Sequence, residues 1–86
     1  MKFEFTHHAI KSFKKLDKSI GARILEKLKY WSKLENPLKA AKALEGYSNV
    51  FRYRVGDWRI VVSPSNKNDV IDILDIGHRS NIYENL

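Results

Sequence analysis

The chain has 86 residues, 43% of them hydrophobic and 12% aromatic, which suffices for a small core and excludes a disordered chain. It contains no cysteine, so a disulfide framework, a thiolate nucleophile and a thiolate metal site are excluded. The formal net charge of +6 at pH 7 predicts affinity for polyanions such as RNA, DNA or an acidic protein.

The length leaves room for one domain, residues 1–86. No apolar run approaches the length of a membrane span, and residues 1–5 lack the apolar core of a signal peptide. We therefore expect a cytoplasmic protein that makes no membrane contact.

Residues 1–36 predict a strand followed by two helices. Residues 2–5 alternate as a short strand does, and Thr6 is a candidate N-cap for the first helix. A break at residues 17–19 supplies a second capping signal, and Asn36-Pro37 closes the second helix because proline disfavours helical geometry in the preceding residue. The apolar positions at helical spacing are Ile10, Phe13 and Leu16 in the first helix and Ile20, Ile24, Leu28 and Trp31 in the second.

Residues 37–44 are compatible with a short third helix or with an irregular connection. A β-hairpin follows over residues 49–62, and its loop Gly56-Asp57 has glycine at the first central position, as type II′ turns require. Residues 70–76 are apolar except for two aspartates and indicate a central strand covered on both faces. This order predicts an α+β fold, in which an N-terminal strand and a helix hairpin precede a three-stranded antiparallel sheet and the helices pack on one sheet face.

The hairpin carries the most informative functional signal, because alternation places three arginines on one face. Counting outward from the turn puts Arg54 directly opposite Arg59 and Tyr53 opposite Ile60, with Arg52 on the same face as the arginine pair. Like charges directly opposite each other oppose folding by a few tenths of a kcal/mol, up to about 1. A purely structural hairpin would avoid this arrangement, so we expect the face to bind an anion. The alternative is a solvated sheet face.

Residues 77–83 supply further candidates. Arg79 and Tyr83 are four residues apart and would share one side of a helical turn. There a guanidinium can stabilise or protonate a leaving oxygen, and a phenol can stack on a base. The alternative is a frayed tail with a partly exposed tyrosine. His78 titrates near neutral pH and is either a general acid or base or a hydrogen-bonded surface residue.

The remaining polar groups do not combine into a metal or acid–base site. The three histidines lack neighbouring cysteines or clustered carboxylates. Simple alternation places Asp72 and Asp75 on opposite faces of the last strand, so we expect a salt bridge from one of them rather than a carboxylate pair. The lysine-rich helices are either a solvated face or a salt-dependent contact surface for structured RNA.

Three segments together resemble one family of small toxins. They are residues 41–46 (AKALEG), 51–61 (FRYRVGDWRIV) and 76–83 (IGHRSNIY). In order and spacing they are similar to the RelE branch of the RelE/ParE superfamily of bacterial and archaeal toxin–antitoxin operons, and the resemblance covers nearly the whole chain. It implies an mRNA interferase, an endoribonuclease without metal or cofactor that enters the ribosomal A site, cuts the codon there and inhibits translation.

The resemblance also implies roles for five residues. Arg52 matches the residue that contacts the region of the scissile phosphate, and Arg54 matches the residue that activates or orients the 2′-hydroxyl. Arg59 matches the arginine that stabilises the pentavalent phosphate. Arg79 matches the acid toward the 5′-oxygen, and Tyr83 matches the tyrosine that stacks on the substrate. The products would be a 2′,3′-cyclic phosphate and a 5′-hydroxyl.

Arg52 and Arg54 depart from the family pattern, in which both positions are often lysine. Because a guanidinium keeps its proton at neutral pH, Arg54 is a poor general base, and we assign it to charge stabilisation and substrate positioning. Whether the site has a base stays open, with His78 as the candidate that titrates near neutral pH.

The resemblance further implies an acidic antitoxin that wraps the basic surface, together with the ribosome, its RNA and mRNA as partners. The superfamily also contains ParE toxins that poison DNA gyrase without nuclease activity, and these typically lack this set of arginines and tyrosine. A basic RNA-binding module without chemistry is a third interpretation.

Overall fold

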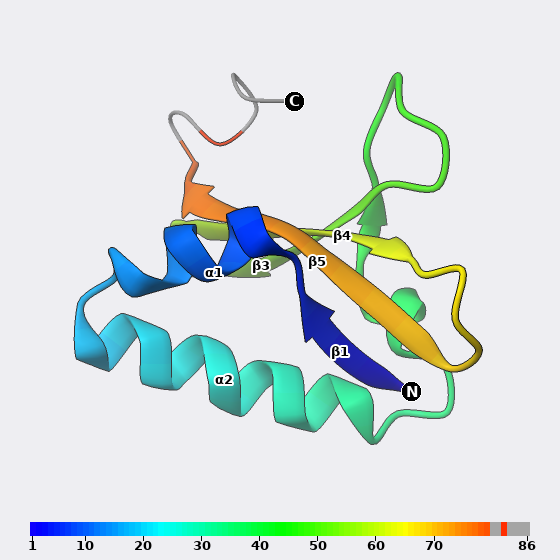
Figure 1. The fold of residues 1–86 in the computed structure, drawn as a ribbon, viewed down its shortest axis with the longest axis horizontal. Helices are drawn as coiled ribbons and strands as arrows, with labels where there is room; N and C mark the ends of the chain where they lie inside the picture. Colours follow the sequence, from blue (N-terminus) through cyan, green and yellow to red (C-terminus); the bar gives the residue numbers. More distant parts are fainter. Residues whose placement is uncertain (80–81, 83–86) are drawn as a thin grey trace.

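The computed structural model describes residues 1–79 and 82. The elements in chain order are β1 (Lys2–Phe5), α1 (His7–Lys14), α2 (Lys18–Ser32), the 3₁₀ helix η1 (Pro37–Ala40), β2 (Lys42–Ala43), β3 (Phe51–Val55), β4 (Trp58–Pro64) and β5 (Val70–His78). The strands form one five-stranded sheet in the order β1-β5-β4-β3-β2 (Figure 1). β1 runs parallel to β5, and all other neighbours are antiparallel. The predicted α+β fold is confirmed, with one strand more than the sequence indicated.

The start of α1 agrees with the sequence-based prediction, whereas the end of α2 does not. Thr6 Oγ1 accepts a hydrogen bond from the Ala9 N–H at 3.1 Å, which confirms Thr6 as the N-cap of α1. The predicted end of the second helix at Asn36-Pro37 lies beyond the observed end at Ser32, because the next two backbone N–H groups bond three residues back, in 3₁₀ geometry. Within the described residues, no helix combines the length and apolar character needed to cross a membrane.

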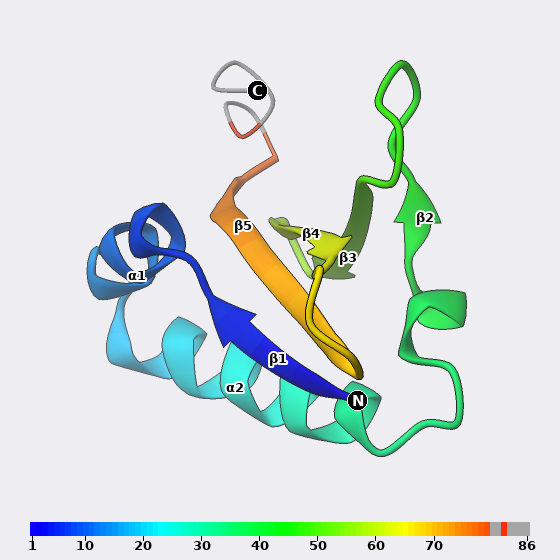
Figure 2. The same ribbon diagram turned by 45° about the vertical axis from the view of Figure 1, so that its right-hand side comes forward.

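Residues 37–44 form neither one helix nor an irregular connection. The 3₁₀ turn of η1 ends at Ala40, and Ala41 is extended, with φ −105° and ψ 162°. β2 then pairs Lys42 with Arg52 and Ala43 with Phe51, at the edge of the sheet beside β3 (Figure 2). The sequence does not predict this fifth strand because two residues are too few to display an alternating pattern.

α2 covers one face of the sheet through an aromatic stack. The rings of Trp31 and Tyr53 lie 4.0 Å apart between centroids, with 14° between their planes. The Tyr53 hydroxyl donates to the Pro37 carbonyl at 2.8 Å, and burial raises the pKa of this phenol to about 12. Other buried members of this core are Ile24, Leu28, Ile60, Ile71 and Ile73.

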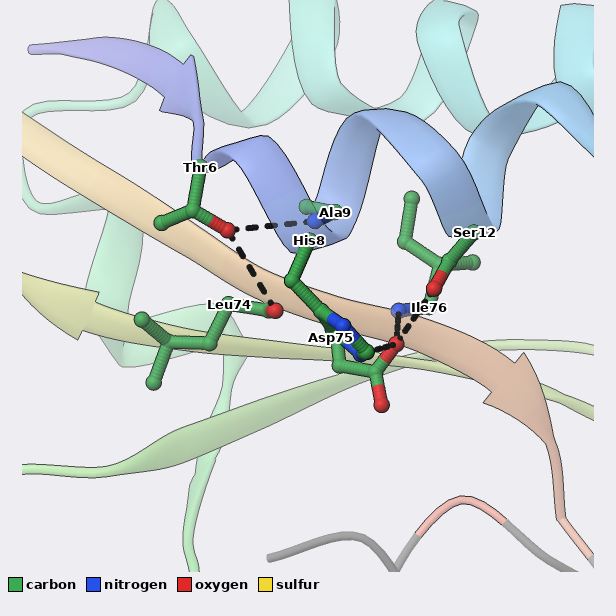
Figure 3. Close-up of polar contacts among 7 residues, drawn as sticks. All are labelled: Thr6, His8, Ala9, Ser12, Leu74, Asp75 and Ile76. Carbon is green, nitrogen blue, oxygen red and sulfur yellow. Dashed lines mark hydrogen bonds and ion pairs between the residues drawn. The ribbon is translucent and has the colours of Figure 1, made fainter.

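α1 lies beside β5, beyond the point where β1 ends (Figures 1 and 2). Asp75 joins the two elements through one buried oxygen, Oδ1. This atom accepts from Ser12 Oγ and from the Ile76 N–H, both at 2.8 Å, and lies 3.2 Å from His8 Nε2 (Figure 3). The salt bridge expected from one of the two aspartates is therefore present at Asp75 when His8 is protonated.

A β-bulge changes the register between β4 and β5. Val61 pairs with Asp75, whereas the next residue of β4 pairs with Ile73, which leaves Leu74 without a partner on β4. The extra residue resets the alternation, so Asp72 and Asp75 fall opposite two positions of β4 that share a face. The prediction that they occupy opposite faces is therefore wrong.

Candidate functional site

The hairpin between β3 and β4 fixes the positions of three arginines. Gly56 has a φ of +59° whereas Asp57 has no positive φ, as a type II′ turn requires. The register pairs Arg54 with Arg59, and Arg52 points to the same side of the sheet. The predicted placement of these arginines is confirmed. We call Arg52, Arg54 and Arg59 the arginine face.

Arg59 is the most constrained member of the arginine face. It is only 7% exposed, and its Nη1 donates to the Gly56 carbonyl at 3.0 Å and to the Trp58 carbonyl at 3.2 Å. These bonds hold the guanidinium over the turn. Its charge is therefore oriented before any ligand arrives, which is the condition for efficient electrostatic stabilisation.

Arg79 reaches the same turn from the end of β5. Its backbone N–H donates to the Asp57 carbonyl at 2.8 Å, and its Nε lies 3.9 Å from Asp57 Oδ1. Both side chains are largely exposed, so the ion pair contributes little to stability and the backbone bond places Arg79 beside the hairpin. Arg59 and Arg79 therefore both bond to backbone carbonyls of this turn. Tyr83, the fifth predicted site residue, lies outside the described residues.

β2 adds a cation that the sequence-based site did not include. Lys42 lies directly opposite Arg52 across β2 and β3. A hollow of about 140 Å³ is lined by Ala40, Lys42, Arg52 and Arg54. Lys42 lies in the segment 41–46 that carries the resemblance, but its place beside the arginines depends on pairing with Arg52 in a strand too short to recognise in the sequence.

Three of these cations have neither an ion pair nor a side-chain hydrogen bond in the part of the chain that the structure describes. There, the side chains of Lys42, Arg52 and Arg54 make no ion pair or hydrogen bond. Lys42 with Arg52 and Arg54 with Arg59 are therefore two like-charged cross-strand pairs on one face. Each such pair opposes folding by up to about 1 kcal/mol, and an anion bound between the cations would offset this repulsion.

His78 lies on the other side of the sheet. It pairs with Trp58, and the two rings meet edge to face with centroids 5.5 Å apart. Because Trp58 faces away from the arginines, His78 is not placed to act as a base on the arginine face. A larger hollow of about 400 Å³ lies at His78, Asp75 and Lys15, and the described residues that line it include none of the predicted arginines.

The chemistry available at the arginine face is electrostatic. Guanidinium groups are planar donors that bind phosphate oxygens in a bidentate manner. Oriented donors of this kind stabilise charge that develops in a transition state, each typically worth about 10²–10³ in rate. Among the described residues, no group of three His, Asp or Glu side chains is arranged to hold a metal ion.

A family model matches this chain over almost its whole length. Residues 3–83 match the model of the ParE toxin of the type II toxin–antitoxin system parDE. A comparison with curated proteins finds no match.

Solved structures of toxin–antitoxin complexes contain chains with the same fold. A chain of the RelBE2 complex from Mycobacterium tuberculosis is 25% identical, with a TM-score of 0.77 over 92% of this chain and 91% of that one. A chain of the RelB–RelE complex from Methanococcus jannaschii is 29% identical, with a TM-score of 0.69 over 95% and 96%. A chain of the RelE–RelB complex from Pyrococcus horikoshii OT3 is 27% identical, with a TM-score of 0.70 over 91% and 93%. The chain belongs to the ParE toxin family of type II toxin–antitoxin systems and has the RelE-like fold of the RelE/ParE superfamily.

Proposed function

We propose that this toxin is a metal-independent endoribonuclease that cleaves mRNA in the ribosomal A site and so inhibits translation. The observation that carries the proposal is the arginine face, where Arg54 and Arg59 are directly opposed and none of the three arginines has an acidic partner among the described residues. Its ligand would be a group with concentrated negative charge, and a phosphodiester at its transition state is such a group.

In the proposed reaction the 2′-oxygen of one nucleotide attacks the adjacent phosphorus. The O2′–P bond forms, the P–O5′ bond breaks, and protons leave the 2′-hydroxyl and reach the 5′-oxygen, so that the products are a 2′,3′-cyclic phosphate and a 5′-hydroxyl. The pentavalent transition state carries more negative charge than the starting diester. Arg59, held by the Gly56 and Trp58 carbonyls, supplies an oriented positive charge for it.

The other site residues take complementary roles in this proposal. Arg54 neutralises and positions the scissile phosphate, and Arg52 binds the strand beside it. Arg79 donates to the 5′-oxygen, and Tyr83 stacks on a substrate base. Arg54 cannot serve as the base because a guanidinium keeps its proton at neutral pH, and His78 faces away from the arginines. We therefore propose that solvent, and not a side chain of the arginine face, accepts the proton of the 2′-hydroxyl.

We further propose an acidic antitoxin that covers the arginine face and keeps it from RNA. The relatives from three organisms were solved as complexes of RelE with RelB, and the net charge of +6 favours an acidic partner. The ribosome and its mRNA would be the target, in the cytoplasm.

The family model supports a second candidate, a toxin that poisons DNA gyrase without cleaving RNA. It predicts double-strand breaks and filamentous cells with intact mRNA. The arginine face favours the ribonuclease because it offers a site for the phosphate of a substrate.

Primer extension on mRNA in a reconstituted translation reaction tests the proposal. We expect antitoxin-free protein to cut codons in the A site, with no cuts on naked RNA. Arg79→Ala should abolish the cuts while preserving the fold, because the backbone bond from residue 79 to Asp57 does not need the side chain. Lys11→Ala, an exposed change on α1, is the control that should retain them. Absence of cuts by the folded protein, together with trapped gyrase–DNA complexes, would select the second candidate.

A further inference from the structure

β2 presents one cation beside the arginine face, and no role has been assigned to it. We propose that Lys42 is an RNA-positioning residue, which binds the phosphate next to the one held between Arg54 and Arg59. The inference rests on the proposed ribonuclease function and extends its site from the hairpin onto β2. It follows from the observed pairing of Lys42 with Arg52 and from the hollow that these two residues share with Arg54.

The spacing of the two cationic pairs suits two consecutive phosphates. Arg52 and Arg54 are two residues apart on one strand and point the same way, which puts them about 7 Å apart. Successive phosphates of an extended single strand have a comparable spacing. The pair formed by Lys42 and Arg52 and the pair formed by Arg54 and Arg59 can therefore each bind one phosphate of the same strand.

Lys42 is poorly suited to a structural role. It is exposed, and within residues 1–79 and 82 its ammonium group has no acidic partner. β2 is held by backbone pairing with β3, whereas the side chain of Lys42 adds repulsion against Arg52. Lys39, three residues earlier on η1, is also exposed but neither pairs across a strand nor lines the hollow.

The lining of the hollow favours a polyanion such as RNA over an apolar protein segment. Its described walls are one alanine, one lysine and two arginines. Protein–protein interfaces rely on an apolar core in which charged residues are depleted. A nucleic-acid backbone requires positive charge and hydrogen-bond donors, which this hollow offers.

Fluorescence anisotropy with a short single-stranded RNA tests the inference separately from catalysis. The oligonucleotide carries a 2′-deoxy nucleotide at the cleavage position, so it cannot be cut, and its affinity for the full antitoxin-free chain is measured over a range of salt concentrations. We expect Lys42→Ala to bind about fivefold more weakly at low salt. We also expect the slope of log affinity against log salt to fall by about 0.7, the value for one lost contact to a single strand. Lys42→Arg should restore both, and Lys39→Ala should change neither.

The melting temperature distinguishes a role of Lys42 in RNA binding from a role in stabilising the fold. We expect Lys42→Ala to melt no lower than the wild-type chain, because the substitution removes a like-charged neighbour of Arg52. A fall in melting temperature shared by Lys42→Ala and Lys42→Arg would assign Lys42 a structural role and overturn the inference.

The remaining outcomes distinguish this inference from the function on which it rests. Weaker RNA binding by Arg54→Ala but not by Lys42→Ala overturns the role of Lys42 and leaves the ribonuclease proposal in place. The role is also overturned if Lys42→Ala weakens binding of an acidic antitoxin peptide but not of RNA. If the wild-type chain neither binds the oligonucleotide at low salt nor cuts mRNA on the ribosome, both proposals fail together.

Discussion

Trp31 of α2 lies flat against Tyr53 of β3, with ring centroids 4.0 Å apart. The Tyr53 hydroxyl also donates to the Pro37 carbonyl of η1, so one buried side chain connects three elements. Arg52 and Arg54 flank Tyr53 in the sequence and project from the opposite side of the strand. Packing on the α2 side of the sheet therefore determines how these two guanidinium groups are presented on the other side.

Removing the Tyr53 hydroxyl should destabilise this connection. We expect Tyr53→Phe to lower the free energy of unfolding by about 1–3 kcal/mol, because it leaves the buried Pro37 carbonyl without its donor. Urea denaturation followed by circular dichroism measures the change. Tyr30→Phe is the matched control, since Tyr30 is 61% exposed, and it should be neutral. Equal stability of the two variants would contradict the structural role of the hydroxyl.

The same phenol predicts a pH dependence at the alkaline end. Burial raises the pKa of Tyr53 from 10.0 to about 12 in the folded chain. Between these values the unfolded chain loses the phenol proton while the folded chain keeps it, so the stability contributed by the neutral phenol is fully present below pH 10.0 and is lost as the pH rises toward about 12. Over this range we expect the wild-type chain to lose about 2 kcal/mol more than Tyr53→Phe. Parallel stability curves for the two proteins would refute this expectation.

The contact between α1 and β5 depends on Asp75 more than on its histidine partner. Asp75 is 5% exposed, and its Oδ1 accepts from both Ser12 and the Ile76 N–H. We expect Asp75→Ala to cost about 2–4 kcal/mol, because both donors lose their acceptor. His8 has a side chain that is 61% exposed, so His8→Ala should cost less than about 1 kcal/mol. Thermal denaturation of both variants at neutral pH gives the comparison, and a larger loss from His8→Ala would show that the ion pair dominates.

The pairing of Arg54 with Arg59 should lower the stability of the fold while it supports cleavage. Arg54→Gln removes the like charge opposite Arg59, so we expect the free energy of unfolding to rise by about 0.2–1 kcal/mol. We expect cleavage on the ribosome to fall about 10²-fold or more, because one of the charges proposed to stabilise the transition state is lost. Lys27→Gln, an exposed change on α2, should alter neither quantity. If Arg54→Gln destabilises the chain, the repulsion argument is wrong, and if it cleaves normally, Arg54 is not part of the site.

Local features of the sequence predicted most of the arginine face. The Gly56-Asp57 turn and the alternating residues on either side set the pairing of Arg54 with Arg59, and both signals come from neighbouring residues. The N-cap at Thr6 was predictable for the same reason, since a cap depends on residues within one helical turn. Tyr83 and the catalytic roles stay predictions that rest on the family resemblance.

Turn chemistry and strand alternation are local, so the amino-acid sequence alone predicts the class of fold and the face on which three arginines lie. Three other arrangements appear only in the folded chain: Lys42 lies opposite Arg52, Arg79 bonds to the turn at Asp57, and Asp75 accepts a hydrogen bond from α1. Each of these arrangements joins segments that are distant along the chain. They depend on how the sheet is assembled and packed, which the pattern of any single segment does not specify.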